Sequence, residues 1–313
     1  MKRYFRLAHF LIATSALLAA FAGAASGREP VKLRVLFLGN SYTYFNNLPQ
    51  LVAGLSLAAG QEKTLETEMV TIGGATLKIL WEDGGALRAI KKHKWDYVVL
   101  QEQSTLGPSP VVDGSPQIND PQVFYEYARR FDAELKKAGT KTIFYLTWAR
   151  QNRPETQAVL TAAYQSIGQE LKAIVAPVGL AWESALKERP QLILHLPDKA
   201  HPNQCGSYLA ACVFYAILFG QSPEGLPGKL AGPAVDYTGS VRGDKGHVEL
   251  VNLSAADAAL LQKIAWQTVQ QQSKSPEHEK SGAFWDPHVL LADARHLSGR
   301  TARPKPGNES SPR

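Results

Sequence analysis

The chain has 313 residues, of which 44% are hydrophobic and 20% charged, and its formal net charge is +6. This composition is typical of a globular protein, and no stretch after the first 27 residues is apolar enough to span a membrane. The weak basic excess does not indicate binding to nucleic acid.

The first 27 residues have the composition and order of a secretory signal peptide. Lys2, Arg3 and Arg6 precede an apolar run at 7–20, and small residues follow. We expect cleavage between residues 24 and 27, the alternative being a retained anchor. Removing three basic side chains and no acidic one lowers the net charge to +3 (6 − 3).

The mature chain is expected to be one domain at 28–274, followed by a polar, disordered tail at 275–313. Cys205 and Cys212 lie in one predicted helix, which places them about 10 Å apart. A disulfide requires a Cα separation below about 7 Å, so they are not expected to pair. Export without a disulfide predicts a bacterial protein that is periplasmic or secreted.

Strand and helix patterns alternate along the mature chain. The predicted strands occupy 33–38, 65–72, 96–101, 141–147 and 177–180. The predicted helices occupy 48–59, 77–92, 124–138, 155–174, 182–188, 204–219 and 254–272, with a break expected at 83–85 in the second. This alternation predicts an α/β fold with a mainly parallel five-stranded sheet and helices on both faces.

Polar turns follow the first three predicted strands. They are GNS at 39–41, Gly73-Gly74, and QEQS at 101–104. Ligands of such sheets bind at the carboxyl ends of the strands, so these turns are where we expect the chemistry. A long loop at 106–121 follows the third strand and is also expected to be functional.

Ser41 has two interpretations, a helix N-cap or a nucleophile. The nearest predicted helix begins only near residue 48, which weakens the first. Asp198 and His201 lie three apart, and Pro202 keeps His201 out of a helix. An aspartate this close can accept from Nδ1 and leave Nε2 for a serine, although each residue alone is often structural.

Residues 31–221 resemble the SGNH, or GDSL-type, hydrolases, because four motifs occur in the order found in that family. They are GNS, Gly-Gly, QEQS and Asp-x-x-His. The resemblance implies a three-layer α/β/α sandwich with Ser41 as nucleophile, His201 as base and Asp198 as its orienting partner. Asn40 stands where that family often has Asp, which we expect to matter little.

The resemblance also implies three oxyanion donors. Two are the backbone N–H groups of Ser41 and Gly74, with Gly73 as the alternative to Gly74. The third is an amide side chain, but the usual Gly-x-Asn-Asp of the family is missing. Gln101 is the expected replacement and Gln103 the alternative, as in sialate O-acetylesterase-like members. The remaining alternative is that both glutamines are ordinary polar loop residues.

Several polar and aromatic residues near these motifs are candidates for binding substrate. Tyr42, Tyr44 and Asn46 flank the serine, Gln103 follows the third strand, and Trp148 follows the fourth. The alternative is that they support loops or pack in the core. The histidines show no metal-ligand spacing, and fingerprints of P-loops, dinucleotide sites and Gly-x-Ser-x-Gly elbows are missing, so we expect no cofactor and no metal.

The predicted function is that of an exported serine esterase that removes acyl groups, acetyl above all, from carbohydrate. A lipid-directed esterase or lysophospholipase on the same fold is the first alternative. Its acyl groove would be apolar, whereas the loops after these strands are rich in Asn, Gln, Ser and Gly. A carbohydrate-binding or scaffold protein without activity is the second alternative. The expected partner is an acylated carbohydrate or other small ester, without stable membrane insertion.

Overall fold

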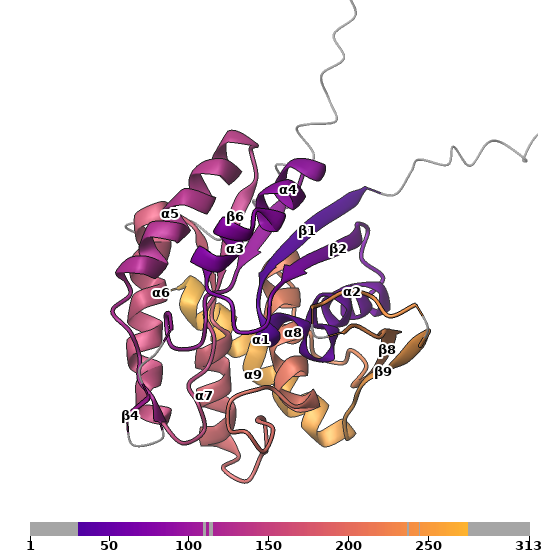
Figure 1. The fold of residues 1–313 in the computed structure, drawn as a ribbon. Coiled ribbons are helices and arrows are strands. Elements are labelled where there is room, and N and C mark those ends of the chain that lie inside the picture. The colour runs from indigo at the N-terminus through magenta and orange to yellow at the C-terminus, as the bar shows by residue number, and fades with distance from the viewer. Residues whose placement is uncertain (1–30, 109–110, 113–114, 237, 244, 275–313) are drawn as a thin grey trace, which may run out of the picture. The chain divides into compact units, whose positions relative to one another are not determined.

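The computed structural model describes residues 31–274, apart from 109–110, 113–114, 237 and 244. The predicted signal peptide and tail lie outside the described residues. Residues 32–274 contain a parallel sheet of five strands in the order β2-β1-β3-β6-β7 (Figure 1). The strands are β1 (Lys32–Gly39), β2 (Thr64–Thr71), β3 (Tyr97–Leu100), β6 (Lys141–Tyr145) and β7 (Ile174–Ala176).

Helices follow each of these strands. They are α1 (Ser41–Tyr44), α2 (Leu48–Ala58), α3 (Leu77–Asp83), α4 (Gly85–Lys92), α5 (Gln122–Lys137), α6 (Gln157–Leu171), α7 (Val178–Glu188), α8 (Gln204–Phe219) and α9 (Ala255–Ser273), with short 3₁₀ turns at Phe45–Asn47 and Pro154–Thr156. Ser254 caps α9 by accepting from the Asp257 N–H, as its place before the apolar pattern predicts.

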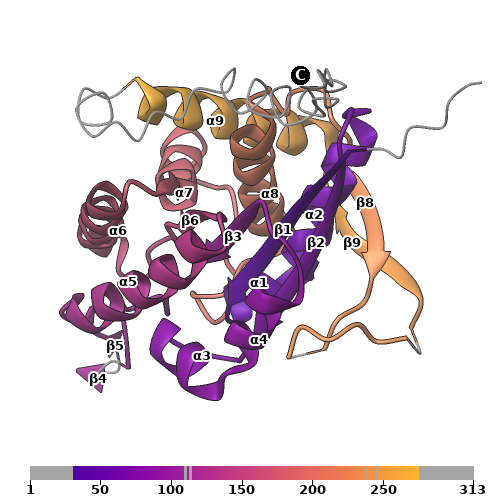
Figure 2. The same ribbon diagram turned by 90° about the horizontal axis from the view of Figure 1, so that it is seen from above.

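The sheet separates two apolar cores. Successive residues of a strand face opposite sides, so Val35 and Phe37 pack with α2, α7, α8 and α9, whereas Leu36 and Leu38 pack with α3, α4, α5 and α6. Figure 2 shows α7, α8 and α9 on one side of the sheet and α3 and α5 on the other. Burial of both faces explains the continuous apolar runs, and the predicted three-layer α/β/α class is confirmed.

The sequence prediction is correct for four strands and wrong for the fifth. Residues 177–180 are not a strand, because β7 is Ile174–Ala176 and α7 begins at Val178. Pro177 lacks the N–H that would continue the ladder and precedes the first helical turn of α7 instead. The expected break at 83–85 is confirmed, since Gly84 has a φ of 77° between α3 and α4.

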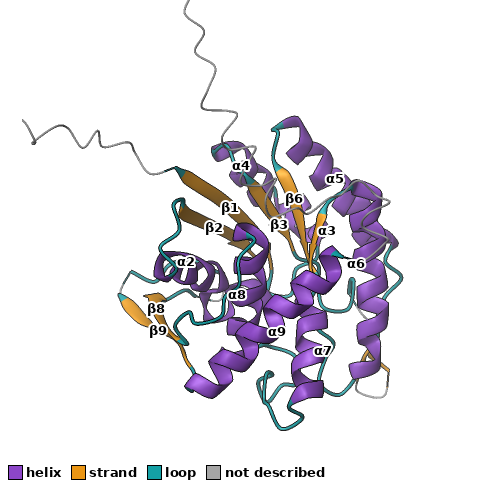
Figure 3. Ribbon diagram, turned by 180° about the vertical axis from the view of Figure 1, so that it is seen from behind, coloured by secondary structure: helices purple, strands orange, loops and turns teal. Residues whose placement is uncertain are grey.

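Two antiparallel hairpins lie outside the main sheet. One is the short pair β4 (Val111–Val112) and β5 (Ser115–Pro116), within the long loop after β3. The other joins β8 (Lys229–Pro233) to β9 (His247–Asn252) and lies beside α2 (Figure 3). The sequence did not predict this second hairpin.

Both cysteines are free thiols, as their spacing in α8 predicts. Burial raises the pKa of Cys205 and of Cys212, which keeps both protonated. In the part of the chain that the structure describes, every helix is too short or too polar to cross a bilayer.

Candidate active site

Ser41, His201 and Asp198 form one hydrogen-bonded chain at the carboxyl edge of the sheet. Nε2 of His201 lies 2.9 Å from Oγ of Ser41, and Nδ1 lies 2.5 Å from Oδ2 of Asp198. The fold brings Ser41 and His201 together although they lie 160 positions apart in the sequence. A carboxylate can only accept, so Nδ1 carries the proton in the neutral ring and Nε2 accepts from the serine hydroxyl.

The Asp198 carboxylate organises its own loop as well as the imidazole. Oδ1 accepts from the N–H groups of Ala200 (3.0 Å) and His201 (2.9 Å), which leaves Oδ2 for the ring. Partial burial raises the pKa of Asp198, but the Ala200 N–H, the His201 ring and the His201 N–H lower it further, to about 2. Asp198 is therefore ionised at neutral pH.

Ser41 is not a helix cap in this structure. The cap of α1 is Asn40, whose Oδ1 accepts from the Tyr42 N–H at 3.1 Å, and Ser41 is the first helical residue. The Ser41 hydroxyl does not cap the helix and instead donates a hydrogen bond to Nε2 of His201. A short helix placed directly after β1, which the sequence pattern did not predict, thus presents the hydroxyl at the edge of the sheet.

The side chain of Gln101 holds the serine turn by hydrogen bonds. Its Oε1 accepts from the Asn40 N–H (2.9 Å) and the Thr43 hydroxyl (3.0 Å), while Nε2 donates to the Glu102 carbonyl. The side chain has no exposed surface. A Cβ at position 39 would lie 2.5 Å from the Gln101 amide oxygen, which explains why Gly39 ends the strand.

This position argues against the expectation that Gln101 is the oxyanion amide, because both ends of its amide are already hydrogen-bonded within the protein. Gln103 is half-buried, and its Oε1 accepts from the Thr105 N–H at 2.6 Å. Its amide nitrogen has no acceptor in the described structure. Of the two glutamines, only Gln103 has an amide donor that remains available.

Asn40 joins the serine turn to the turn after β2. Its Nδ2 donates to the Ala75 carbonyl at 2.9 Å, so the Gly73-Gly74 segment is held beside Ser41. The N–H groups of Ser41, Gly73 and Gly74 take part in none of the described hydrogen bonds. An aspartate at position 40 has no N–H for this bond, so the difference from GDS has a structural consequence that the sequence reasoning missed.

Aromatic rings surround His201. Phe45 stacks on the imidazole with ring centroids 4.5 Å apart, and Tyr42 meets it edge-on at 5.6 Å. Tyr42 in turn stacks on Trp148 at 4.4 Å, and the Trp148 indole N–H donates to the Ala200 carbonyl. These ring contacts and the hydrogen bond to Ala200 hold the imidazole and its loop in place.

The same packing corrects the expectation that Tyr42 and Trp148 contact substrate. Tyr42 is 4% exposed and Trp148 is fully buried, so both rings form the support of the base loop. Tyr44 and Asn46 remain partly exposed beside Ser41.

Glu102 is a buried carboxyl group that the sequence reasoning did not single out. Its two oxygens accept from the N–H groups of Leu77 (3.0 Å) and Gln103 (2.7 Å), which ties the start of α3 to the end of β3. Burial raises the pKa of Glu102 to about 7, against the opposing effect of these two bonds. Within the described residues, no group of three or more His, Cys, Asp or Glu side chains could hold a metal ion.

Comparison of the structure with solved structures gives several matches. A Bacteroides uniformis protein of the DUF4886 family has 17% identity and a TM-score of 0.55, with 80% of this chain and 99% of that chain covered. The acetyl xylan esterase AlAXEase has 16% identity and a TM-score of 0.50, with coverage of 59% and 98%. A Slackia heliotrinireducens protein, provisionally described as an SGNH hydrolase, has 24% identity and a TM-score of 0.48, with coverage of 59% and 97%.

No family model and no curated protein sequence matches the chain. Similarity at these identities concerns the fold alone. The chain therefore has a three-layer α/β/α fold that it shares with the DUF4886 family protein and with the acetyl xylan esterase.

Proposed function

We propose that the protein is a serine ester hydrolase that uses Ser41, His201 and Asp198. The observation that carries this proposal is the continuous chain of two hydrogen bonds from the Ser41 hydroxyl through the imidazole to the Asp198 carboxylate. Serine alone is a weak nucleophile at neutral pH, and this arrangement gives it a base whose orientation is fixed.

The proposed reaction has two halves. Oγ of Ser41 attacks the ester carbonyl carbon while Nε2 of His201 takes its proton, and the imidazolium then protonates the departing alcohol. A water molecule, deprotonated by the same nitrogen, then attacks the acyl carbonyl carbon. The acid is released as the bond to Oγ breaks, and the imidazolium returns the proton to Oγ of Ser41. The ionised Asp198 stabilises the imidazolium in both halves and needs no change of protonation, in keeping with its low pKa.

The oxyanion of each tetrahedral intermediate is proposed to bind the N–H groups of Ser41 and of Gly74 or Gly73. Gln103 is the proposed amide donor in place of Gln101. Removing one such donor raises the free energy of the transition state by about 3 kcal/mol. Asn40 contributes by holding the two turns that carry the backbone donors at a fixed separation.

The proposed substrate is a carbohydrate ester, with acetyl as the acyl group. Two features support this: the fold is shared with a protein described as an acetyl xylan esterase, and partly exposed Tyr44, Asn46 and Gln103 surround the serine with polar and aromatic surface. The basic and apolar order of residues 1–27 supports export, to the periplasm or the medium of a bacterial cell.

The test is acetate release from acetylated oligosaccharides and from 4-nitrophenyl acetate. Ser41→Ala is expected to lower kcat by roughly 10⁴-fold or more on both, with an unchanged far-UV circular dichroism spectrum. A fluorophosphonate probe should label the native protein at Ser41. Undiminished hydrolysis by the variant, or failure to label the folded protein, would leave the non-catalytic alternative.

An acyl-length series separates this proposal from the lipid-directed alternative. With 4-nitrophenyl esters, kcat/KM is expected to be highest for the acetyl ester and to fall as the chain lengthens. A preference for chains of eight or more carbons would favour a lipid substrate instead.

A further inference from the structure

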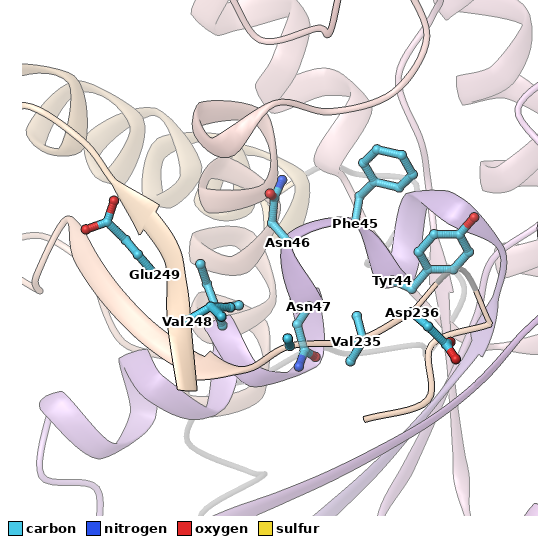
Figure 4. A pocket seen from close by; sticks show the side chains of 10 residues that line it. Tyr44, Phe45, Asn46, Asn47, Val235, Asp236, Val248 and Glu249 are labelled. Carbon is cyan, nitrogen blue, oxygen red and sulfur yellow. The ribbon is translucent and has the colours of Figure 1, made fainter. Parts of the chain in front are cut away.

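A pocket of about 420 Å³ lies between the serine loop and the β8–β9 hairpin. Residues 44–47 form one wall, and residues 234–236 and 248–250 form the other (Figure 4). This volume falls within the range of small-molecule sites, about 300–1,000 Å³. The hairpin belongs to the part of the chain beyond the motifs, so the main sheet and its helices alone do not make this pocket.

Residues of the serine loop connect the pocket to the catalytic groups. Phe45, which lines it, stacks on the His201 imidazole, and Tyr44 lies three residues after Ser41. Burial and the Asp236 carboxylate raise the pKa of Tyr44, and the Ser41 hydroxyl acts in the opposite direction. Tyr44 and Asp236 both line the pocket, and Figure 4 shows both side chains at it.

The wall next to the serine is held in an unusual backbone conformation. Asn46 and Asn47 have φ angles of 52° and 48°, in the left-handed region that most side chains avoid. The Asn46 amide donates to the Ser207 hydroxyl (2.8 Å), and the Asn47 amide donates to the Pro233 carbonyl (2.9 Å). These two bonds join the loop to α8 and to the hairpin, so the position of this pocket wall is fixed by specific hydrogen bonds.

Asn47 also carries an unused acceptor. The residue is 1% exposed, and its Oδ1 has no donor in the described structure. A buried acceptor left without a partner costs about 1–3 kcal/mol. A ligand hydroxyl at the base of the pocket would provide the missing donor.

The charged residues that line the pocket, Asp236 and Glu249, are both acidic. Asp236 lines it with a pKa lowered by bonds from the Thr238 hydroxyl and N–H, so it is ionised at neutral pH. Glu249 also lines it and pairs with Lys229 at 3.2 Å. Arg242 also acts on Asp236, so each carboxylate has a basic neighbour. Aromatic, apolar and amide groups beside these carboxylates suit an uncharged polyol, and none of the described residues that line the pocket is basic and able to bind an anion.

We propose that this pocket binds the alcohol part of the ester as a neutral sugar ring, with a ring hydroxyl donating to the Asn47 amide oxygen. The inference rests on the proposed esterase function and deepens it by naming the substrate class. It assigns the β8–β9 hairpin a role in specificity and excludes uronic and sialic acid esters as preferred substrates.

The first test fills the pocket. Val235→Trp and, from the opposite wall, Val248→Trp are expected to raise KM for an acetylated neutral xylo-oligosaccharide at least tenfold. Neither should change kcat/KM for 4-nitrophenyl acetate more than about twofold, because that ester does not need the pocket. Val241→Trp is the matched control, since Val241 bridges Val235 but is 63% exposed and does not line the pocket.

The second test uses charge. Wild-type kcat/KM is expected to be at least tenfold lower for an acetylated glucurono-oligosaccharide than for its neutral counterpart, and Asp236→Asn should narrow that ratio. The proposal is overturned if the filled variants fold and keep the wild-type KM for the neutral sugar, if they lose both substrates equally, or if the anionic ester is preferred. Wild-type protein that cleaves neither ester would instead overturn the esterase assignment.

Discussion

The two halves of the candidate site are held by different kinds of contact. The serine turn is fixed by bonds between residues far apart in the sequence: Gln101 to Asn40, 61 positions away, and Asn40 to Ala75, 35 positions away. The base loop is fixed by Asp198, through bonds to residues two and three positions on. The position of the nucleophile thus depends on hydrogen bonds across the sheet, whereas the hydrogen bonds between Asp198 and the base loop are local. Apart from Ser41, the distant contacts of His201 are with aromatic rings.

The largest expected effect comes from the local half. Asp198→Asn keeps an oxygen for the Ala200 and His201 N–H groups but presents an amide N–H to Nδ1, which favours the wrong tautomer of the ring. We expect kcat to fall about 10⁴-fold, as the same change does in serine proteases. The measurement is 4-nitrophenyl acetate hydrolysis, and unfolding in urea should move little. A loss below tenfold would show that His201 does not need this carboxylate.

The contrast between the halves also explains what the sequence predicts. Asp198-x-x-His201 with Pro202 contains the whole base loop within five residues, so its geometry can be reasoned from spacing alone. The buried amide of Gln101 cannot, because its partners Asn40 and Thr43 become neighbours only when β1 and β3 pair. Reasoning from the strand end alone therefore assigned Gln101 to the wrong surface of the turn.

The fold shows the same division. Continuous apolar runs and caps predict four strands of the main sheet and its principal helices, because burial on both faces leaves a strong local pattern. The β8–β9 hairpin was missed because residues 223–246 are rich in Gly and Pro and carry little apolar periodicity. It forms by packing on α2, and this tertiary contact is not encoded in the local pattern.

The serine turn, which is held by bonds between distant residues, can be disrupted at Gln101. Gln101→Leu leaves the Asn40 N–H and the Thr43 hydroxyl buried without an acceptor, at about 1–3 kcal/mol each. We expect the free energy of unfolding to fall by about 2–4 kcal/mol and kcat/KM to fall about 10²-fold as Ser41 shifts. Urea unfolding and ester hydrolysis measure the two effects on the same protein.

Gln103→Leu is the matched control for that variant. Gln103 is the proposed oxyanion donor, so its loss should lower kcat by about 10²–10³-fold. Because the Thr105 N–H loses its acceptor, the free energy of unfolding should also fall, by about 1–2 kcal/mol. The reverse pattern, with Gln101→Leu stable and inactive and Gln103→Leu active, would restore Gln101 as the donor.

Glu102 gives the long-range half a dependence on pH. Its folded pKa of about 7 lies above the ordinary value of 4.5, so the folded state binds the proton more tightly. Unfolding free energy is therefore expected to decrease as pH rises from about 4.5 to 7, by up to about 3 kcal/mol. Glu102→Gln cannot titrate and should lose this slope, which urea unfolding at intervals between pH 4.5 and 8 would measure. A variant with the wild-type slope would assign the titration to another group.

The smallest effect is expected at Asn40, and it tests whether the serine turn and the Gly73-Gly74 turn act as a unit. Asn40→Asp keeps the cap on α1 but replaces the donor to the Ala75 carbonyl with a second acceptor. The backbone donors of the two turns should separate, and we expect kcat for 4-nitrophenyl acetate to fall about tenfold with KM nearly unchanged, because the interaction lost is made in the transition state.

Thr76→Ala is the control for that change, because it alters the same turn without touching the link. Thr76 caps α3 by accepting from the Ile79 N–H at 3.2 Å, so its loss should cost about 1 kcal/mol of stability and leave kcat unchanged. If Asn40→Asp also lost only stability, the link to Ala75 would be a matter of folding, and the aspartate of the common GDS motif would serve this site equally well.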